Sequence, residues 1–272
     1  MSTASNLPPF DTRGLRMTQS PNPSWKFGQK IEATPEGKRW MEGAKNGWKV
    51  IDTSVEDKRK LYATLISGIV PRPVAFISTV SATGTENLAP FSWFNQVSSD
   101  PPVVAVGCYN LPTGLKDSAQ NIRDTKGFTI NIISEPWLEQ ANACSIDCPP
   151  NVSEWGISGL TKEPSLSVKA PRVKESAFVM ECELLQAIDI LDPETKVAKC
   201  TMILGTVKYI HIRNDVLDER GYADPAKLKP VSRLGNITYA VIKDALQLPR
   251  PTWEKDGEEI MKVLGGTSKT SL

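Results

Sequence analysis

Apolar and polar residues alternate most clearly over residues 176–190 and 199–213. A period of two is typical of antiparallel strands that bury one face. Shorter runs rich in β-branched and aromatic residues, at 73–80, 103–109 and 128–133, predict three further strands. The pattern therefore predicts an antiparallel β-barrel or sandwich with added helices.

Helical spacing is confined to short segments between and beside these strands. Leu61 and Leu65 share one face of a predicted helix over residues 56–66, and a Pro-Arg-Pro triplet at 71–73 follows it. Other short helices are predicted within residues 111–125, 136–160, 243–247 and 254–263, and one near residues 36–44 would form if the first 50 residues are a loose tail. We therefore expect an α+β fold in which strands dominate.

The first 50 residues differ from the rest, because they hold five prolines and little periodic apolar pattern. They also contain Trp25, Trp40 and Trp48, whereas a plain disordered tail would be poor in aromatics. We predict an extended arm that packs on the rest of the chain or on a partner subunit, and a loose tail with one short helix stays open as the alternative. The predicted organisation is an arm over 1–50, a main domain over 51–245 and a tail over 246–272.

Composition excludes several classes of partner. The net charge is +1, so the chain lacks the excess of positive charge that is typical of proteins that bind nucleic acid or an anionic membrane. No 18 apolar residues run together, so no membrane span is expected. The five cysteines are an odd number without a C-x-x-C pair, which favours a reducing, cytoplasmic setting over a disulfide scaffold.

The single histidine, His211, limits the available chemistry. Histidine-rich metal sites need residues that this chain lacks, and we predict no metal site. Neither a G-x-S-x-G elbow nor a glycine-rich phosphate loop of the usual kinds occurs. His211 lies in an alternating segment and is better explained as a sheet residue than as a base. No catalytic acid or base stands out, so chemistry supplied by a cofactor is a serious option.

Short polar side chains cluster where two predicted strands meet. Ser78 and Thr79 end one strand, and Ser92 and Asn95 follow in the next segment. Such donors, together with free backbone N–H groups, can hold phosphate and ribityl oxygens. Clusters of this composition are more often simple loops, so this signal alone is weak.

An ordered series of short motifs covers the middle of the chain. It opens with P-R-P-V-A-F-I-S-T at 71–79 and N-L-A-P-F-S at 87–92, and continues with K-D-S-A-Q-N-I at 116–122. It ends with R-L-G at 233–235 and a tyrosine at 239. In this order and spacing, the series resembles the flavin reductase-like, FMN-binding split-barrel family.

The resemblance implies a mainly β fold: a six-stranded antiparallel split barrel with peripheral helices, binding FMN in preference to FAD at a homodimer interface. The ring and ribityl side would be lined by Asn87, Ala89, Pro90 and Ser92, with Trp93 and Asn95 close by. Ser78 and Thr79 would lie beside the flavin, partly through backbone groups. Lys116 and Ser118 would approach the phosphate, and Arg72 would be a further anion contact. The implied cofactor-binding residues are Arg72, Ser78, Thr79, Asn87, Ala89, Pro90, Ser92, Trp93, Asn95, Lys116 and Ser118.

One departure from the family pattern concerns the phosphate. Many members place a basic residue just before the aromatic of the G-L-T segment, and this chain has Glu154 before Trp155. Other residues must then bind the phosphate, or the phosphate is bound more weakly. The difference could also mean that the ligand is not the usual one of the family.

The expected activity is that of an oxidoreductase that passes electrons from NAD(P)H through FMN to a small-molecule substrate or acceptor. Two alternatives stay open. One is a specialised flavin-dependent oxygenase or redox enzyme on the same fold, and the other is a non-catalytic flavin electron carrier.

Overall fold

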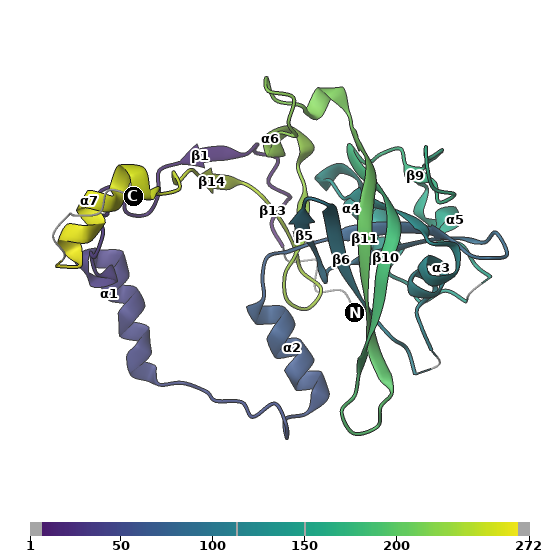
Figure 1. The fold of residues 1–272 in the computed structure, drawn as a ribbon, viewed down its shortest axis with the longest axis horizontal. Helices are drawn as coiled ribbons and strands as arrows, with labels where there is room; N and C mark the ends of the chain where they lie inside the picture. Colours follow the sequence, from purple (N-terminus) through teal and green to yellow (C-terminus); the bar gives the residue numbers. More distant parts are fainter. Residues whose placement is uncertain (1–6, 113, 150, 266–272) are drawn as a thin grey trace. The chain divides into compact units, whose positions relative to one another are not determined.

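The structure is a computed structural model that describes residues 7–112, 114–149 and 151–265. The chain divides into two compact units, one formed by residues 59–242 and the other by the two terminal segments, up to residue 58 and from residue 243 (Figure 1). Residues 1–6 of the predicted arm and 266–272 of the predicted tail lie outside the described residues.

The larger unit is built on a seven-stranded antiparallel sheet with the order β4-β3-β7-β10-β11-β6-β5. The predicted mainly β fold with peripheral helices is confirmed. The strands are β3 (Ala75–Val80), β4 (Glu86–Phe91), β5 (Phe94–Ser99), β6 (Pro102–Tyr109), β7 (Gly127–Ile132), β10 (Phe178–Leu191) and β11 (Ala198–Ile212).

The sheet has one strand more than the six that the resemblance implied, and residues 86–99 supply two of the seven, β4 and β5. A bend at Ser92 and Trp93 separates β4 from β5, and these two are the edge strands of the sheet. Three peptide units join Phe91 to Phe94, which limits their Cα atoms to about 11 Å apart. The two edges must therefore meet at this bend, so the sheet curls into a barrel that is open between β4 and β5.

Two apolar cores cover the two faces of the curled sheet. On β3, the neighbouring residues Phe76 and Ile77 are both fully buried, yet they belong to different cores, as the alternation of a strand requires. Ile77 packs in the core that contains Phe128, whereas Phe76 lies in the outer core, with its ring centroid 5.6 Å from that of Trp137. Trp137 and Trp155 are both 5% exposed and belong to this outer core.

Short helices and small sheets surround the barrel. The helices of this unit are α2 (Lys58–Gly68), α3 (Asp117–Thr125), α4 (Leu138–Ala143), α5 (Trp155–Ser158) and α6 (Pro225–Leu228), with 3-10 turns η4 (Glu135–Trp137) and η5 (Asn214–Val216). One small sheet joins β2 (Arg72–Pro73), β12 (Val231–Arg233) and β13 (Tyr239–Val241), and another pairs β8 (Lys162–Glu163) with β9 (Arg172–Val173).

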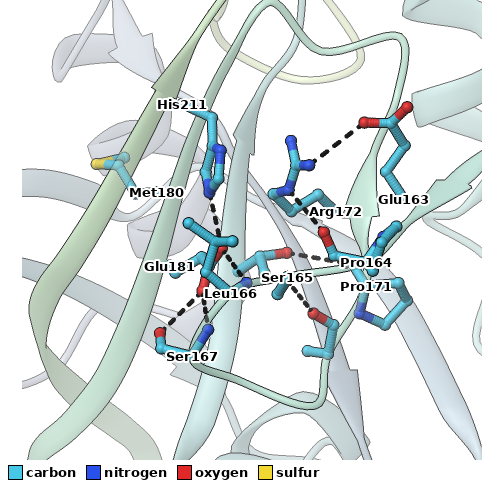
Figure 2. Close-up of polar contacts among 12 residues, drawn as sticks. Glu163, Pro164, Ser165, Leu166, Ser167, Pro171, Arg172, Met180, Glu181 and His211 are labelled. Atoms are coloured by element: carbon cyan, nitrogen blue, oxygen red, sulfur yellow. Dashed lines mark hydrogen bonds and ion pairs between the residues drawn. The ribbon is translucent and has the colours of Figure 1, made fainter.

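A buried carboxylate holds the loop between β8 and β9 against the barrel. Glu181 on β10 accepts hydrogen bonds from the backbone N–H groups of Leu166 and Ser167 and from the Ser167 hydroxyl, at 2.7–2.8 Å (Figure 2). His211 on β11 lies against the same carboxylate, with Nε2 2.7 Å from Oε1. The single histidine is therefore a sheet residue, as its alternating segment predicted.

The smaller unit contains η2 (Ile31–Ala33), α1 (Pro35–Glu42), η3 (Gly43–Asn46), α7 (Trp253–Val263) and a two-stranded parallel sheet of β1 (Arg16–Thr18) and β14 (Asp244–Leu246). Thr34 caps α1 and Thr252 caps α7. The predicted helix over 243–247 is wrong, because this segment pairs with β1, a partner more than 200 residues away in sequence. Trp40 and Trp48 are 77% and 87% exposed in the single chain, so the surface that the arm covers stays a prediction.

Candidate functional site

A cavity of about 960 Å³ opens in the larger unit beside the bend that joins the two edges of the sheet. This volume lies at the upper end of the range for small-molecule and cofactor sites. Three segments supply most of its wall: the end of β4 with the bend (Asn87 and residues 89–93), the start of α3 (residues 115–118) and the loop after α4 (residues 144–149). Tyr62, Gly107, Tyr109, Leu111 and Glu154 complete the lining.

The first wall combines apolar surface with two polar groups. Ala89 and Pro90 present apolar atoms to the cavity, and Asn87 is held by a 2.9 Å hydrogen bond from Nδ2 to the Ser118 hydroxyl. Ser92 lies at the bend itself. Such a surface can cover one edge and face of a flat heterocycle while offering a few fixed polar groups.

The Trp93 indole packs closely on Gly107 of β6, and a side chain at position 107 would crowd it. A Cβ added at Gly107 would stand 3.0 Å from Trp93 Cε3, and the Gly107 N–H donates to the Trp93 carbonyl at 2.7 Å. Tyr62 from α2 packs against the same indole, with ring centroids 6.3 Å apart. The bend therefore presents an aromatic pair that could stack on a planar ligand.

The start of α3 supplies the polar end of the cavity. Lys116 is the N-cap residue, and its own side chain makes no capping hydrogen bond to the N–H groups of the first turn. These groups and the helix dipole favour an anion at this point. Lys116 Nζ lies 2.8 Å from Asp147 Oδ1, so the ammonium already has a carboxylate partner from the loop after α4. Burial raises the pKa of Asp117, and the charge of Lys116 opposes this shift.

Glu154 brings a second buried carboxyl to the cavity. It is 4% exposed, and its Oε2 accepts a 3.0 Å hydrogen bond from the Leu88 N–H. Burial raises its pKa above the usual value, although the Leu88 N–H works in the opposite direction. This is the residue that stands where a basic side chain was expected from the family pattern.

The two lining cysteines are not activated thiols. Burial raises the pKa of Cys144 to about 12, and it also raises that of Cys148. Both thiols therefore stay protonated near neutral pH, which argues against a thiolate nucleophile. Within the part of the chain that the structure describes, no cluster of three His, Cys, Asp or Glu residues could hold a metal ion.

Seven of the eleven predicted residues line this cavity: Asn87, Ala89, Pro90, Ser92, Trp93, Lys116 and Ser118. The other four lie outside the lining. Ser78 and Thr79 are fully buried in β3, where Thr79 Oγ1 accepts a hydrogen bond from Asn121, and Asn95 is exposed on β5. Because Ser78 and Thr79 pair with Leu88 and Asn87 on β4, they support the cavity wall from behind.

Arg72 also lies behind the wall, where it holds the fold together. Its guanidinium donates to the carbonyl oxygens of Ile66, Ile69 and Leu234, and Nε donates to the Ser92 hydroxyl at 3.3 Å. Burial lowers its pKa. Arg72 thus donates to four described acceptors within the protein, and it is not among the residues that line the cavity.

Sequence reasoning missed the aromatic residues Tyr62 and Tyr109 and the loop at 144–149. Tyr109 could have been found, since it is two residues from Gly107 on β6 and therefore on the same face of that strand. The loop and Tyr62 gave no such signal, because their position depends on how α4 and α2 pack.

This arrangement defines a split-barrel protein with a ligand cavity at the opening of the barrel. Residues 67–228 match the model of the family described as flavin reductase like domain. An uncharacterized protein of Aquifex aeolicus is 36% identical over 184 residues, which cover 67% of this chain and 90% of that protein. The chain therefore belongs to the flavin reductase like family.

Two solved structures are similar to this chain. Nitrilotriacetate monooxygenase component B from Bacillus cereus is 31% identical with a TM-score of 0.71, over 74% of this chain and 99% of that one. A Shewanella frigidimarina protein with a split barrel domain has a TM-score of 0.64 at 20% identity, over 75% and 100% of the two chains, and supports the fold alone. The family and the Bacillus cereus neighbour support a flavin-related redox function.

Proposed function

We propose that this protein is an FMN-binding oxidoreductase that passes electrons from NAD(P)H through the flavin to a small-molecule acceptor. The observation that carries the proposal is the cavity itself. It combines an apolar and aromatic wall at residues 89–93 with an uncapped helix N-terminus and Lys116 at one end. A flat ring with a phosphorylated polar chain is the ligand class that this combination suits.

The lining residues divide naturally between the parts of such a ligand. Ala89, Pro90 and Trp93 would contact the ring, and Asn87 would offer a fixed amide to polar atoms beside it. Lys116 and the N–H groups at the start of α3 would hold the phosphate of FMN. A bound flavin would supply the hydride and single-electron chemistry, while the chain binds and orients it.

The described lining contains no histidine and no thiol with a lowered pKa. This agrees with a site in which the protein holds the cofactor and its own side chains take no nucleophilic part. The apolar wall and the Tyr62–Trp93 pair would cover part of the bound ring, and the polar contacts beneath it would be strengthened where water is displaced.

Three further features belong to the proposal. The protein acts as a homodimer, the electron donor is NADH or NADPH, and the setting is cytoplasmic. The described residues include no helix long and apolar enough to cross a membrane. Sedimentation equilibrium at micromolar concentration tests the dimer, and a monomer there would contradict it.

Site variants test the assignment of the cavity. Asn87→Ala removes a side-chain amide and should weaken binding of both FMN and riboflavin, by about 1 kcal/mol for one hydrogen bond. Lys116→Ala should weaken FMN more than riboflavin, since riboflavin has no phosphate. Fluorescence quenching measures both affinities, and equal losses for the two ligands after Lys116→Ala would remove Lys116 from the phosphate site.

A second candidate is favoured by one of the similar structures, which is named as component B of a monooxygenase. On this reading, the electrons pass from the flavin to a separate oxygenase component. A non-catalytic flavin carrier is the third option. Steady oxidation of NADH or NADPH with free flavin as the acceptor supports a reductase, and flavin binding without such turnover favours the carrier.

A further inference from the structure

The charges on the cavity wall have an unusual balance for a site that takes a phosphate. Among the described lining residues, Lys116 is the one Lys or Arg, whereas Asp117, Asp147 and Glu154 are carboxyls. The nearby Arg72 lies outside the lining and donates to protein acceptors. A phosphate entering this cavity therefore meets one ammonium group and a surplus of acidic ones.

Asp147 acts most directly on that ammonium group. Its Oδ1 lies 2.8 Å from Lys116 Nζ, and the Lys116 side chain is 31% exposed while that of Asp147 is 70% exposed. The two residues come from different elements, the N-cap of α3 and the loop after α4. Asp147 thus contacts one side of the Lys116 ammonium group, and the loop that carries Asp147 forms part of the cavity wall.

Glu154 adds a further carboxyl group to the cavity wall, and no Lys or Arg among the described lining residues is paired with it. Its described hydrogen bond comes from the Leu88 N–H. Lys162, which lies 5.6 Å from the centre of the neighbouring Trp155 ring, is paired with Glu86 instead. The carboxyl at this position therefore does not supply the positive charge that the family pattern led us to expect there.

We propose that Asp147 competes with the ligand phosphate for Lys116, so that this cavity distinguishes little between FMN and unphosphorylated riboflavin. The inference rests on the proposed function, because it concerns how the same cavity selects among flavins. A phosphate that approaches Lys116 must displace the Asp147 carboxylate or share the ammonium with it. Either way, repulsion between the two anions offsets part of the attraction to Lys116.

The experiment compares the affinities of FMN and riboflavin by fluorescence quenching of the full chain. The quantity measured is the riboflavin Kd divided by the FMN Kd, which isolates the effect of the phosphate. In the unmodified protein we expect a ratio below about ten. Asp147→Asn should raise this ratio by about three- to tenfold, because a partly exposed charge pair of this kind contributes about 1 kcal/mol.

A double-variant cycle separates competition for Lys116 from a general change in charge. Lys116→Ala should reduce the ratio more in the Asp147→Asn background than in the unmodified protein, since the ammonium is then free to serve the phosphate alone. Glu183→Gln is the matched control. Glu183 is an exposed carboxylate paired with Lys208 at 3.4 Å on the barrel strands, and it is absent from the cavity lining.

The possible results are distinct. A ratio raised by Asp147→Asn and unchanged by Glu183→Gln supports the inference. A ratio above about 100 in the unmodified protein, or an equal change in both affinities after Asp147→Asn, overturns it and leaves flavin binding intact. Absence of binding for both flavins overturns the proposed function as well. Circular dichroism checks the fold, and Asp147→Ser repeats the test if Asp147→Asn does not fold.

Discussion

Two buried glutamates in the same barrel unit have opposite properties. Glu181 on β10 accepts hydrogen bonds from two backbone N–H groups and one hydroxyl and lies 2.7 Å from His211. Glu154 beside the cavity accepts one described hydrogen bond, from Leu88. The first carboxylate holds a loop in place (Figure 2), and the second forms part of a ligand cavity.

The pKa values follow from this difference in the number of donors. Burial alone would raise the pKa of Glu181, but the N–H groups of Leu166 and Ser167, with help from His211, lower it to about 2. Burial raises the pKa of Glu154, and one N–H donor is too little to reverse the shift. The comparison teaches that burial of a carboxylate does not by itself decide the direction in which its pKa shifts, because the donors around it can reverse the effect of burial.

The largest effect is expected at the loop between β8 and β9. Glu181→Gln places an amide N–H₂ group among hydrogen-bond donors and leaves some of them without an acceptor. The free energy of unfolding should fall by about 2–4 kcal/mol. Urea unfolding at pH 7 measures it, and Glu183→Gln, two residues away and exposed, should change it by less than about 0.5 kcal/mol.

The same carboxylate predicts a pH dependence. Its pKa is about 2 in the folded protein and 4.5 in the unfolded chain, so the unfolded chain binds more protons between these values. The resulting stabilisation, about 3 kcal/mol, is fully present above pH 5 and is lost as the pH falls toward 2. Glu181→Gln should flatten this part of the stability curve, and an unchanged slope would contradict the assignment.

A smaller effect is expected at His211. His211→Gln replaces the planar ring with a more flexible amide and so weakens one contact of the Glu181 carboxylate, but three described donors remain. We expect a loss of about 1 kcal/mol in the free energy of unfolding. Urea unfolding at pH 7 measures this loss, and one as large as that of Glu181→Gln would show that His211, not the backbone N–H groups, dominates the contact.

The smallest effect, with the opposite sign, is expected at Glu154. A raised pKa means that the folded protein holds its proton more tightly, so the contribution of Glu154 to stability is present below pH 4.5 and declines as the pH rises through the folded pKa. Glu154→Gln keeps an oxygen that can accept from Leu88 and removes the charge. Thermal unfolding at pH 7 should show stability equal to the unmodified protein or raised by less than about 1 kcal/mol. A fall of 2 kcal/mol or more would contradict the contrast with Glu181.

The sequence predicted the barrel strands well because their signals are local. The alternation over β10 and β11 and the apolar runs of β3, β6 and β7 reflect burial on one or two faces of a sheet. The strand β14 was missed because its pairing with β1 depends on a distant segment. The bend at Ser92 and Trp93 between β4 and β5 was not predicted, because it follows from the curling of the sheet, which no local pattern records.

The part of the candidate site that could be predicted from sequence is the wall formed by the single segment 87–93. Asn87, Ala89, Pro90, Ser92 and Trp93 lie close in sequence, and five of the seven predicted lining residues come from this stretch. The loop that carries Asp147 reaches the cavity through the packing of α4. The side chains of Ser78 and Thr79 are fully buried in β3, so their predicted contact with the flavin, partly through backbone groups, stays a prediction.

Binding of FMN to the purified full chain tests the central claim most directly. We predict that the protein quenches the fluorescence of added FMN in a saturable titration, with one flavin bound per chain. The complex should show the visible absorption bands of a flavin. Trp93→Ala should weaken this binding, since the indole forms part of the ring wall. A colourless protein that leaves FMN fluorescence unchanged throughout the titration would contradict the account.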